Sequence, residues 1–336
     1  MPIELRRRRA WRLAWGAALS LAASFGMGLP VPILAPVLCV LLLAMRTAAL
    51  PLRLAPVLAV LVLLSCGSGL LLIPLLRHAP LTGVLLVALG LFWVFRYAQR
   101  GGNGLLANLL VIGLTLVAGA GTRDFELALS VVEAMAKGML LAVLCTAVAH
   151  GLCPEPAHAP APAQAPSVVA DAGWIALRAT LIVMPAFLLA LVAPDRFMPL
   201  IMKAVSLGQQ VDGTEARQAA RELVGSTLLA GGLAMLLWGA LSLFVHLWML
   251  FLWVLLAALW QARRLQRLVA TRHSPAYWVS CLTTLLILLG QSVQDSLAGQ
   301  DVYRAFAVRL GLFVLVSLYA SVMLVWIDGR RRGVGG

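Results

Sequence analysis

A carboxylate and an ammonium group interrupt a long apolar stretch in the segment EAMAKGML, residues 133–140. Glu133 and Lys137 are four residues apart, so a helix places both on one face. Each charge at the centre of a membrane helix costs about 2.5–3.5 kcal/mol on insertion scales, which makes chance a weak explanation. The pair is either a self-neutralising polar contact between helices or a functional group. As a functional group, we predict that Lys137 attracts an anionic substrate and that Glu133 relays protons.

Lys137 has a second candidate role, because lysine, unlike arginine, can lose its proton when it is desolvated. Only two of the 26 basic residues are lysines, so a lysine in this apolar segment departs from the chain's preference for arginine. We therefore also consider Lys137 as the group that changes charge, with Glu133 as the partner of that charge.

A second set of polar residues follows helical spacing within residues 277–295: Ser280, Thr284, Gln291 and Asp295. The next apolar segment carries Arg309 about seven residues from its start. We predict that Arg309 and Gln291 bind substrate together with Lys137, and that Asp295 relays protons together with Glu133. The alternatives are that Arg309 extends its guanidinium to the membrane surface and that Asp295 is interfacial.

The elements that position these residues are membrane helices. The chain has 336 residues, of which 62% are hydrophobic and 12% charged; ordinary soluble domains contain about 25% charged residues. Its mean hydropathy is +0.96. The net charge of +13 falls in the gaps between apolar runs, which indicates membrane orientation and not nucleic-acid binding. The five cysteines lack metal-ligand spacing, so we expect no metal and no cofactor.

Apolar runs and the residues that break them predict an all-α integral membrane protein with about twelve spans, between ten and twelve. The expected limits are 12–29, 31–49, 54–75, 80–98, 104–121, 127–150, 174–193, 197–208, 222–244, 246–262, 277–295 and 302–327. Only His246 marks the turn between the ninth and tenth spans. A Pro/Ala-rich cytoplasmic linker, residues 151–173, separates a first membrane repeat, 1–150, from a second, 174–330.

The basic residues predict the orientation of these spans. With the N-terminus in the cytoplasm, 20 arginines and lysines fall on the inner side and four on the outer side, while Lys137 and Arg309 remain in the membrane. This bias favours an even number of spans, both termini in the cytoplasm and a location in the bacterial inner membrane. Residues 1–26 resemble a signal peptide, but further spans follow at once, so we expect an uncleaved first helix.

The two halves are similar in sequence. A shift of 172 residues aligns 105–140 with 277–312 without gaps and places Lys137 on Arg309. Two halves with six spans each form a parallel repeat, and such repeats recur in secondary transporters with substrate sites near the membrane midplane. The alternative is the general likeness of any two amphipathic membrane helices.

The chain lacks a P-loop, HExxH, GxSxG or kinase motif, so we expect no enzyme and no ATPase. An ion gradient remains as the energy source for transport. A membrane-embedded transferase that uses His150 or His246 is a weaker alternative, because no acid or nucleophile is spaced to assist either histidine.

The second half resembles the fusaric acid resistance and aromatic carboxylic acid exporter family of bacterial inner-membrane proteins. The resemblance is carried by Arg178 in GWIALRATLIV, Arg221 in RELVGSTLLAGGLAMLL, Tyr277 at the start of a span, and Arg309 in the final helix. The family's R-x-x-G-T run is one residue longer here, and the large cytoplasmic domain of other members is absent. The resemblance implies export of small organic acids, a periplasmic membrane-fusion adaptor and, in larger assemblies, an outer-membrane channel.

Together these features predict an inner-membrane, proton-driven efflux subunit for small organic or aromatic acids. We expect contact with membrane lipid, an anionic substrate and the adaptor, and we consider a homo-oligomer. The main rival is a membrane scaffold of the cell envelope that transports nothing.

Overall fold

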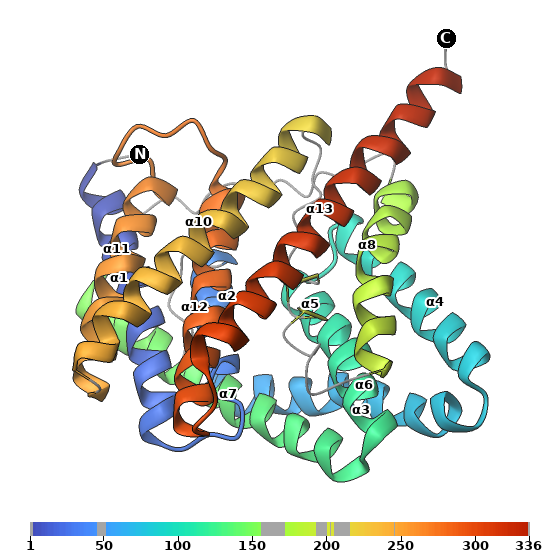
Figure 1. Cartoon of the computed structure of the whole chain (residues 1–336), viewed down its shortest axis with the longest axis horizontal. Helices are drawn as coiled ribbons and strands as arrows, with labels where there is room; N and C mark the ends of the chain where they lie inside the picture. Colours follow the sequence, from blue (N-terminus) through green and yellow to red (C-terminus); the bar gives the residue numbers. More distant parts are fainter. Residues whose placement is uncertain are drawn as a thin grey trace. The chain divides into compact units, whose positions relative to one another are not determined.

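Every regular element that the computed structural model describes is a helix (Figure 1). The described residues are 3–45, 52–155, 172–192, 200–201, 203–204, 216–244 and 246–334. The helices are α1 (Ile3–Gly26), α2 (Leu34–Met45), η1 (Leu52–Leu54), α3 (Ala55–His78), α4 (Pro80–Gln99), α5 (Gly104–Ile112), the π-turn η2 (Gly113–Val117), α6 (Ala118–Arg123), α7 (Phe125–Leu152), α8 (Ala172–Val192), α10 (Ala216–Leu243), α11 (Leu247–Leu265), α12 (Pro275–Leu297) and α13 (Val302–Val334).

Most of the longer helices have the length and composition of membrane spans. Within the described ranges, nine of them carry an apolar window of 18 residues, counting α5, η2 and α6 as one continuous helix. A span of the hydrocarbon core needs about 20 residues. The chain is therefore an all-α, multi-pass integral membrane protein, as its sequence predicts.

The predicted spans agree with the helices to within a few residues over most of the described chain. The break predicted at His246 is confirmed: α10 ends at Leu243, and His246 is the residue before α11. Within the predicted span 31–49, α2 occupies Leu34–Met45, and residues 46–49 lie outside the described residues. Most of the predicted span 197–208 and most of the predicted linker lie outside the described residues, so the count of twelve stays a prediction.

Side-chain caps and glycines set where several helices begin and end. Asn103 accepts hydrogen bonds from the backbone N–H groups of the first turn of α5. Ser274 caps α12 in the same way, and Pro275 follows it in the first turn. Gly299, with φ of 69°, ends α12 in a left-handed turn that Gln300 closes by donating to the Asp295 carbonyl. This turn leads directly into α13.

The described helices form two compact units. Unit 1 comprises residues 1–60, 134–163 and 225–311, and unit 2 comprises 61–133, 164–224 and 312–336. In unit 1, α1 packs along α11 and α2, and α12 packs along the same two helices (Figure 1). The part of α7 that belongs to unit 1 approaches α2 at Gly138, where a Cβ would lie 3.4 Å from the Ala35 nitrogen.

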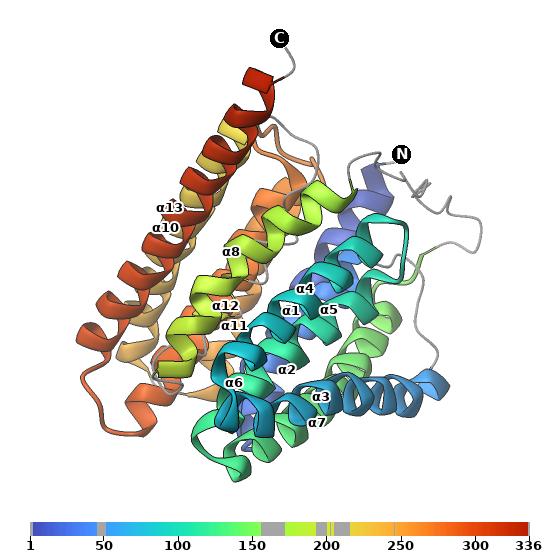
Figure 2. The same ribbon diagram turned by 90° about the vertical axis from the view of Figure 1, so that its right-hand side faces the viewer.

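In unit 2, α8 lies beside α4 and α6 (Figure 2). α3 approaches the π-turn backbone to backbone, since a Cβ on Gly69 would lie 2.1 Å from the Gly113 carbonyl oxygen. Conversely, a Cβ on Gly113 would lie 2.3 Å from the Ser65 carbonyl oxygen. Small residues that permit such close approach are typical of membrane helix interfaces.

The boundaries between the two units fall at similar positions in the two sequence halves. Adding the 172-residue shift to the unit boundaries after residues 60 and 133 gives 232 and 305, within eight residues of the boundaries after 224 and 311. Segments that align with each other therefore fall mostly in different units. This correspondence favours the predicted internal repeat, which stays a prediction.

Candidate functional site

Three of the five residues predicted to act on substrate or protons come together at the end of α12. Gln291 and Asp295 are four residues apart on this helix, and both are buried. The guanidinium of Arg309 donates from Nη1 to Oδ2 of Asp295 and from Nη2 to Oδ1, the latter at 2.7 Å. Such a two-pronged pair is among the stronger charge-assisted hydrogen bonds in proteins.

The turn between α12 and α13 creates this pair. Helical side chains lean toward the N-terminal end of their helix, so the long side chain of Arg309 extends back along α13 toward the turn. Asp295 lies just before the turn on the antiparallel neighbour. The sequence predicted an anion-binding role for Arg309 and a proton-relay role for Asp295, and the structure joins the two in one ion pair.

Gln291 lies one turn from Asp295, farther from the α12–α13 turn. Its Oε1 is buried and has no hydrogen-bond partner within the described residues. Along the same helix Ser280 and Thr284 are fully buried, and Ser226 of α10 donates to Ser280 Oγ at 3.3 Å. The predicted polar row of α12 is thus buried along its length.

Glu133 and Lys137 occupy a different setting. Both lie on an exposed face of α7, in register with the exposed leucines Leu140 and Leu144. Of the chain's two lysines, the one enclosed by protein is Lys203, which has no exposed surface and which the sequence analysis counted among the basic residues of the inner side. The rarity of lysine in this chain was a signal that applied equally to Lys203.

The histidines of the transferase alternative lie at helix ends. The Nδ1 atom of His150 lies 2.8 Å from the Thr146 carbonyl oxygen within α7. His246 precedes α11 and is exposed. Among the described residues, no group of three or more His, Cys, Asp or Glu side chains has the arrangement of a metal site.

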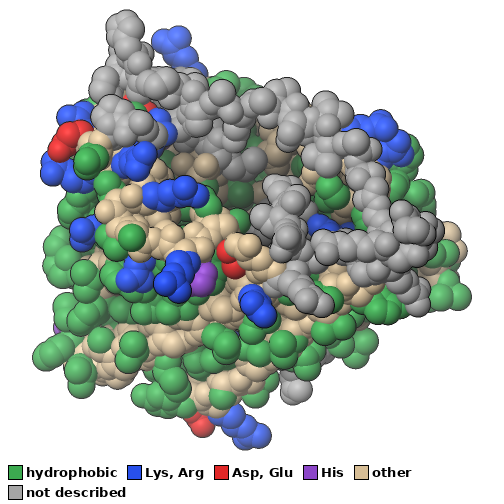
Figure 3. Space-filling view, turned by 90° about the horizontal axis from the view of Figure 1, so that it is seen from above, with side chains coloured by type: hydrophobic (Ala, Val, Ile, Leu, Met, Phe, Trp, Pro, Cys, Tyr) green, Lys and Arg blue, Asp and Glu red, His purple; other side chains and the backbone are tan. Residues whose placement is uncertain are grey.

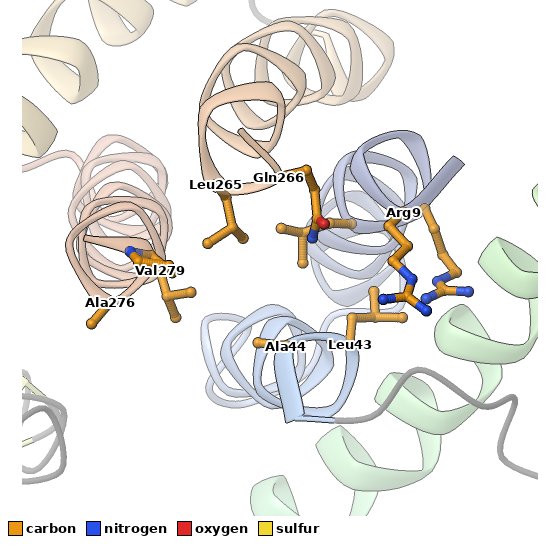
Figure 4. Close-up of a pocket in the computed structure, with 10 residues that line it drawn as sticks. Arg9, Leu43, Ala44, Leu265, Gln266, Ala276 and Val279 are labelled. Carbon is orange, nitrogen blue, oxygen red and sulfur yellow. The ribbon is translucent and has the colours of Figure 1, made fainter. Parts of the chain in front are cut away.

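A cavity of about 320 Å³ lies in unit 1 at the opposite end of α12, among the ends of α1, α2, α11 and α12. Figure 4 shows Leu265, Gln266 and Val279 directed toward the space between these helices, with Arg9 on the side where α1 faces α7. Arg9 and Arg12 of α1 line the cavity and are 8% and 2% exposed. Sequence reasoning treated both only as orientation charges.

Glu155, three residues beyond α7, binds both arginines. Arg9 donates from Nε to Oε1 at 2.8 Å and from Nη2 to Oε2 at 3.0 Å. The Nη1 atom of Arg12 lies 2.8 Å from the same Oε1. Burial by itself would raise the pKa of Glu155, but the hydrogen bond from Arg9 and the charges of Arg12 and Arg9 outweigh it, so the pKa lies below its ordinary value. Glu155 therefore remains a carboxylate at neutral pH.

Aromatic and basic side chains surround this end of the unit. The Arg264 guanidinium lies 3.8 Å from the ring centre of Trp260 and 5.2 Å from that of Trp278. Arg267 and Arg272 of the α11–α12 loop are exposed. Seen from the top of Figure 1, blue Lys and Arg side chains gather over this region (Figure 3). Interfacial tryptophans with arginines are typical of the cytoplasmic surface of a membrane protein.

Comparison with known proteins gives one family match. Residues 9–149 match the family described as Protein of unknown function (DUF2955). The matched region covers α1 to α7 and includes Arg9, Arg12, Glu133 and Lys137, but less than half of the chain. No curated protein and no solved structure matches the chain. The resemblance to the fusaric acid resistance family is therefore not confirmed and stays a prediction.

Proposed function

We propose that this protein is the inner-membrane subunit of an efflux system that exports small organic or aromatic acids, driven by the proton-motive force. In this proposal both termini are cytoplasmic, and the chain has no enzymatic activity. The observation that carries the proposal is the group formed by buried Gln291 and Asp295 and half-buried Arg309, at the end of a membrane helix. Ionisable side chains within membrane helices generally belong to substrate or proton pathways.

The geometry of the group suits a carboxylate substrate. A guanidinium binds carboxylates through two parallel hydrogen bonds, and Asp295 occupies this fork of Arg309. A substrate carboxylate competes for the same fork, and protonation of Asp295 makes the fork available to it. The amide of Gln291 supplies a further polar contact next to this position.

The membrane potential favours the proposed direction of transport. Pro275 and Asp295 are separated by 20 residues of α12, or about 30 Å at 1.5 Å per residue, which is the thickness of the hydrocarbon core. The arginine-rich end and the Asp295 end of α12 thus lie at opposite membrane surfaces. With the arginine-rich end inside, an inside-negative potential drives an anion outward by about 2.3 kcal/mol per charge and 100 mV.

The remaining parts of the proposal rest on the family resemblance and on the composition. A periplasmic membrane-fusion adaptor, and an outer-membrane channel beyond it, would carry the acid across the envelope. Glu133 and Lys137 are proposed as a second proton-relay and substrate-attracting pair on α7.

Export of an aromatic acid tests the proposal. The measurement is efflux of radiolabelled benzoate from preloaded cells that express wild-type protein, Arg309→Gln, Asp295→Asn or Arg304→Gln. Arg304 is an exposed arginine of the same helix and serves as the matched control. We expect efflux at least tenfold slower for Arg309→Gln, since one lost charge-assisted bidentate contact is worth about 1.4 kcal/mol or more. We expect Asp295→Asn to alter the pH dependence of benzoate efflux, and Arg304→Gln to export benzoate at the wild-type rate.

Equal efflux by all variants would contradict the roles of Arg309 and Asp295. No efflux above empty cells, with the protein present in the membrane and the adaptor supplied, would favour the scaffold alternative. That alternative predicts that charge changes alter abundance without altering sensitivity to acids.

A further inference from the structure

The cavity between α1, α2, α11 and α12 has the chemistry of a ligand site. Two guanidinium groups border it, and both arginines are more than nine-tenths buried. Apolar side chains such as Leu13, Leu43 and Val279 form the other walls. A partly open cavity with apolar walls on one side and buried cations on another suits a molecule with one anionic end and one apolar end.

Among the described residues, two cations border the cavity and one carboxylate contacts both of them. Arg9 and Arg12 contribute two positive charges, and Glu155 is the carboxylate that the structure places against them. Arg12 can donate five N–H groups, yet its one ion pair among the described residues is the contact from Nη1 to Glu155. Several N–H donors of Arg12 therefore remain for a second anion.

Glu155 marks where a carboxylate binds. Its Oε1 is shared by Arg9 Nε and Arg12 Nη1, each at 2.8 Å, which is the arrangement that a bound carboxylate adopts between two guanidinium groups. Glu155 is 146 residues from Arg9 in the sequence, so this contact forms only in the folded chain.

We propose that this cavity is a binding site for a small monocarboxylate with an apolar body, and that Glu155 is its built-in competitor for Arg9 and Arg12. The site lies at the arginine-rich end of unit 1, opposite the Asp295 end of α12. It extends the proposed function, because an exporter needs a site where substrate binds on the inner side. Binding itself does not depend on transport, so the two proposals can fail separately.

Substitutions of the arginines and of Glu155 should change the affinity for the ligand in opposite directions. Removing a cation should weaken binding of the ligand, whereas removing the competing carboxylate should strengthen it. If the ion cluster is purely structural, both substitutions should change ligand affinity in the same direction, because each of them only loosens the fold. The direction of the change for Glu155→Gln therefore distinguishes a binding site from a structural cluster.

The test uses the full-length protein in detergent and 4-fluorobenzoate as the probe, with binding followed by fluorine NMR titration. The proteins are wild type, Arg12→Gln, Arg12→Lys, Glu155→Gln and Arg7→Gln. Arg7 is an exposed arginine of the same helix that pairs with Glu4, so its variant is matched in charge and position. Neutral 4-fluorobenzamide and inorganic phosphate serve as ligand controls.

We expect saturable binding to wild type, about tenfold weaker binding to Arg12→Gln, and about tenfold tighter binding to Glu155→Gln. Arg7→Gln should equal wild type. Neutral 4-fluorobenzamide should bind far more weakly than the acid, and phosphate should not displace the acid. Arg12→Lys keeps the positive charge but loses the two parallel N–H donors of the guanidinium. Its affinity for 4-fluorobenzoate should therefore lie between those of wild type and Arg12→Gln.

Three results would overturn the inference: no saturable binding to either wild type or Glu155→Gln, equal binding of the amide and the acid, or weaker binding to Glu155→Gln than to wild type. If Arg12→Gln does not fold, Glu155→Gln and Arg12→Lys decide the question. Intact binding in a protein without efflux would reject the export proposal and leave this site standing. Efflux without binding would do the reverse.

Discussion

At the scale of single residues, the direction of a side chain decides what an intramembrane charge does. Arg309 leans toward the start of its helix and meets Asp295, so two groups that are 14 residues apart become one neutral pair. Lys137 lies instead on an exposed face of α7. Sequence spacing showed that each charge sat in an apolar helix, but it did not show what lay beside it.

Because Lys137 is exposed, its substitution can test a role in transport without a large effect on the stability of the fold. We expect Lys137→Ala to change the free energy of unfolding by no more than about 0.5 kcal/mol, as exposed substitutions generally do. If Lys137 attracts substrate, the same variant should export benzoate several-fold more slowly. Thermal unfolding in detergent and efflux from cells provide the two measurements. Unchanged efflux would remove Lys137 from the mechanism.

Glu155 gives the protein an acid-sensitive contact. The pKa of Glu155 is lower in the folded chain than in the unfolded chain. Its contribution to the free energy of unfolding is therefore complete above the unfolded-state pKa of about 4.3. That contribution is lost as the pH falls through the folded-state pKa. We expect wild-type stability to be flat between pH 6 and 8 with respect to this group and to decrease below about pH 4.5.

Glu155→Gln should lower stability at pH 7 by about 1.5–3 kcal/mol, the usual worth of a charge-assisted hydrogen bond, and should lack this part of the acid transition. Thermal unfolding at a series of pH values is the measurement. An acid transition of identical size in Glu155→Gln would show that the contact does not stabilise the protein.

At the scale of elements, the close approach of α3 to the π-turn depends on two glycines. A methyl group on Gly69 would collide with the Gly113 carbonyl oxygen, and backbone cannot move aside as a side chain can. We expect Gly69→Ala to destabilise the protein by about 1–3 kcal/mol, as overpacking does.

Gly67 is the matched control, because it lies on the same helix and a methyl group there meets nothing within 4 Å. We expect Gly67→Ala to be neutral or to stabilise by up to about 1 kcal/mol through helix propensity. Unfolding measurements on both variants test the contact. Equal stability of the two variants would contradict the backbone approach between α3 and η2.

The elements also show how far sequence reasoning extends. Apolar runs predicted most helices, since hydrophobic length is fixed by the bilayer, and His246 was enough to locate the break before α11. The cavity at Arg9 and Arg12 could not be predicted, because its partner Glu155 lies in a stretch whose proline and alanine content indicates only a linker. The one available signal was that Glu155 was assigned to the same side of the membrane as the five arginines near the N-terminus.

At the scale of the whole molecule, each compact unit combines segments from both sequence halves. A fragment that ends in the linker therefore contains no complete unit. We expect residues 1–160 and 161–336, expressed separately, to be unstable, and the two fragments expressed together to assemble.

Co-purification of the second fragment with an affinity-tagged first fragment measures this assembly. The tagged fragment expressed alone is the control. Two fragments that each purify as stable, folded proteins would contradict a shared core within each unit.

The π-turn in α5–α6 has a consequence for the predicted duplication. Residues 105–123 align without gaps with residues of α12, but η2 adds one residue to a turn of this helix. Every side chain beyond Val117 is thereby rotated by about 100° relative to its counterpart on a regular α-helix, the angle of one residue. Gly119 and Arg123 thus occupy a different rotational position on their own helix from the one that Gln291 and Asp295, with which they align, occupy on α12. The predicted duplication would therefore have produced two helices of similar sequence that present different surfaces.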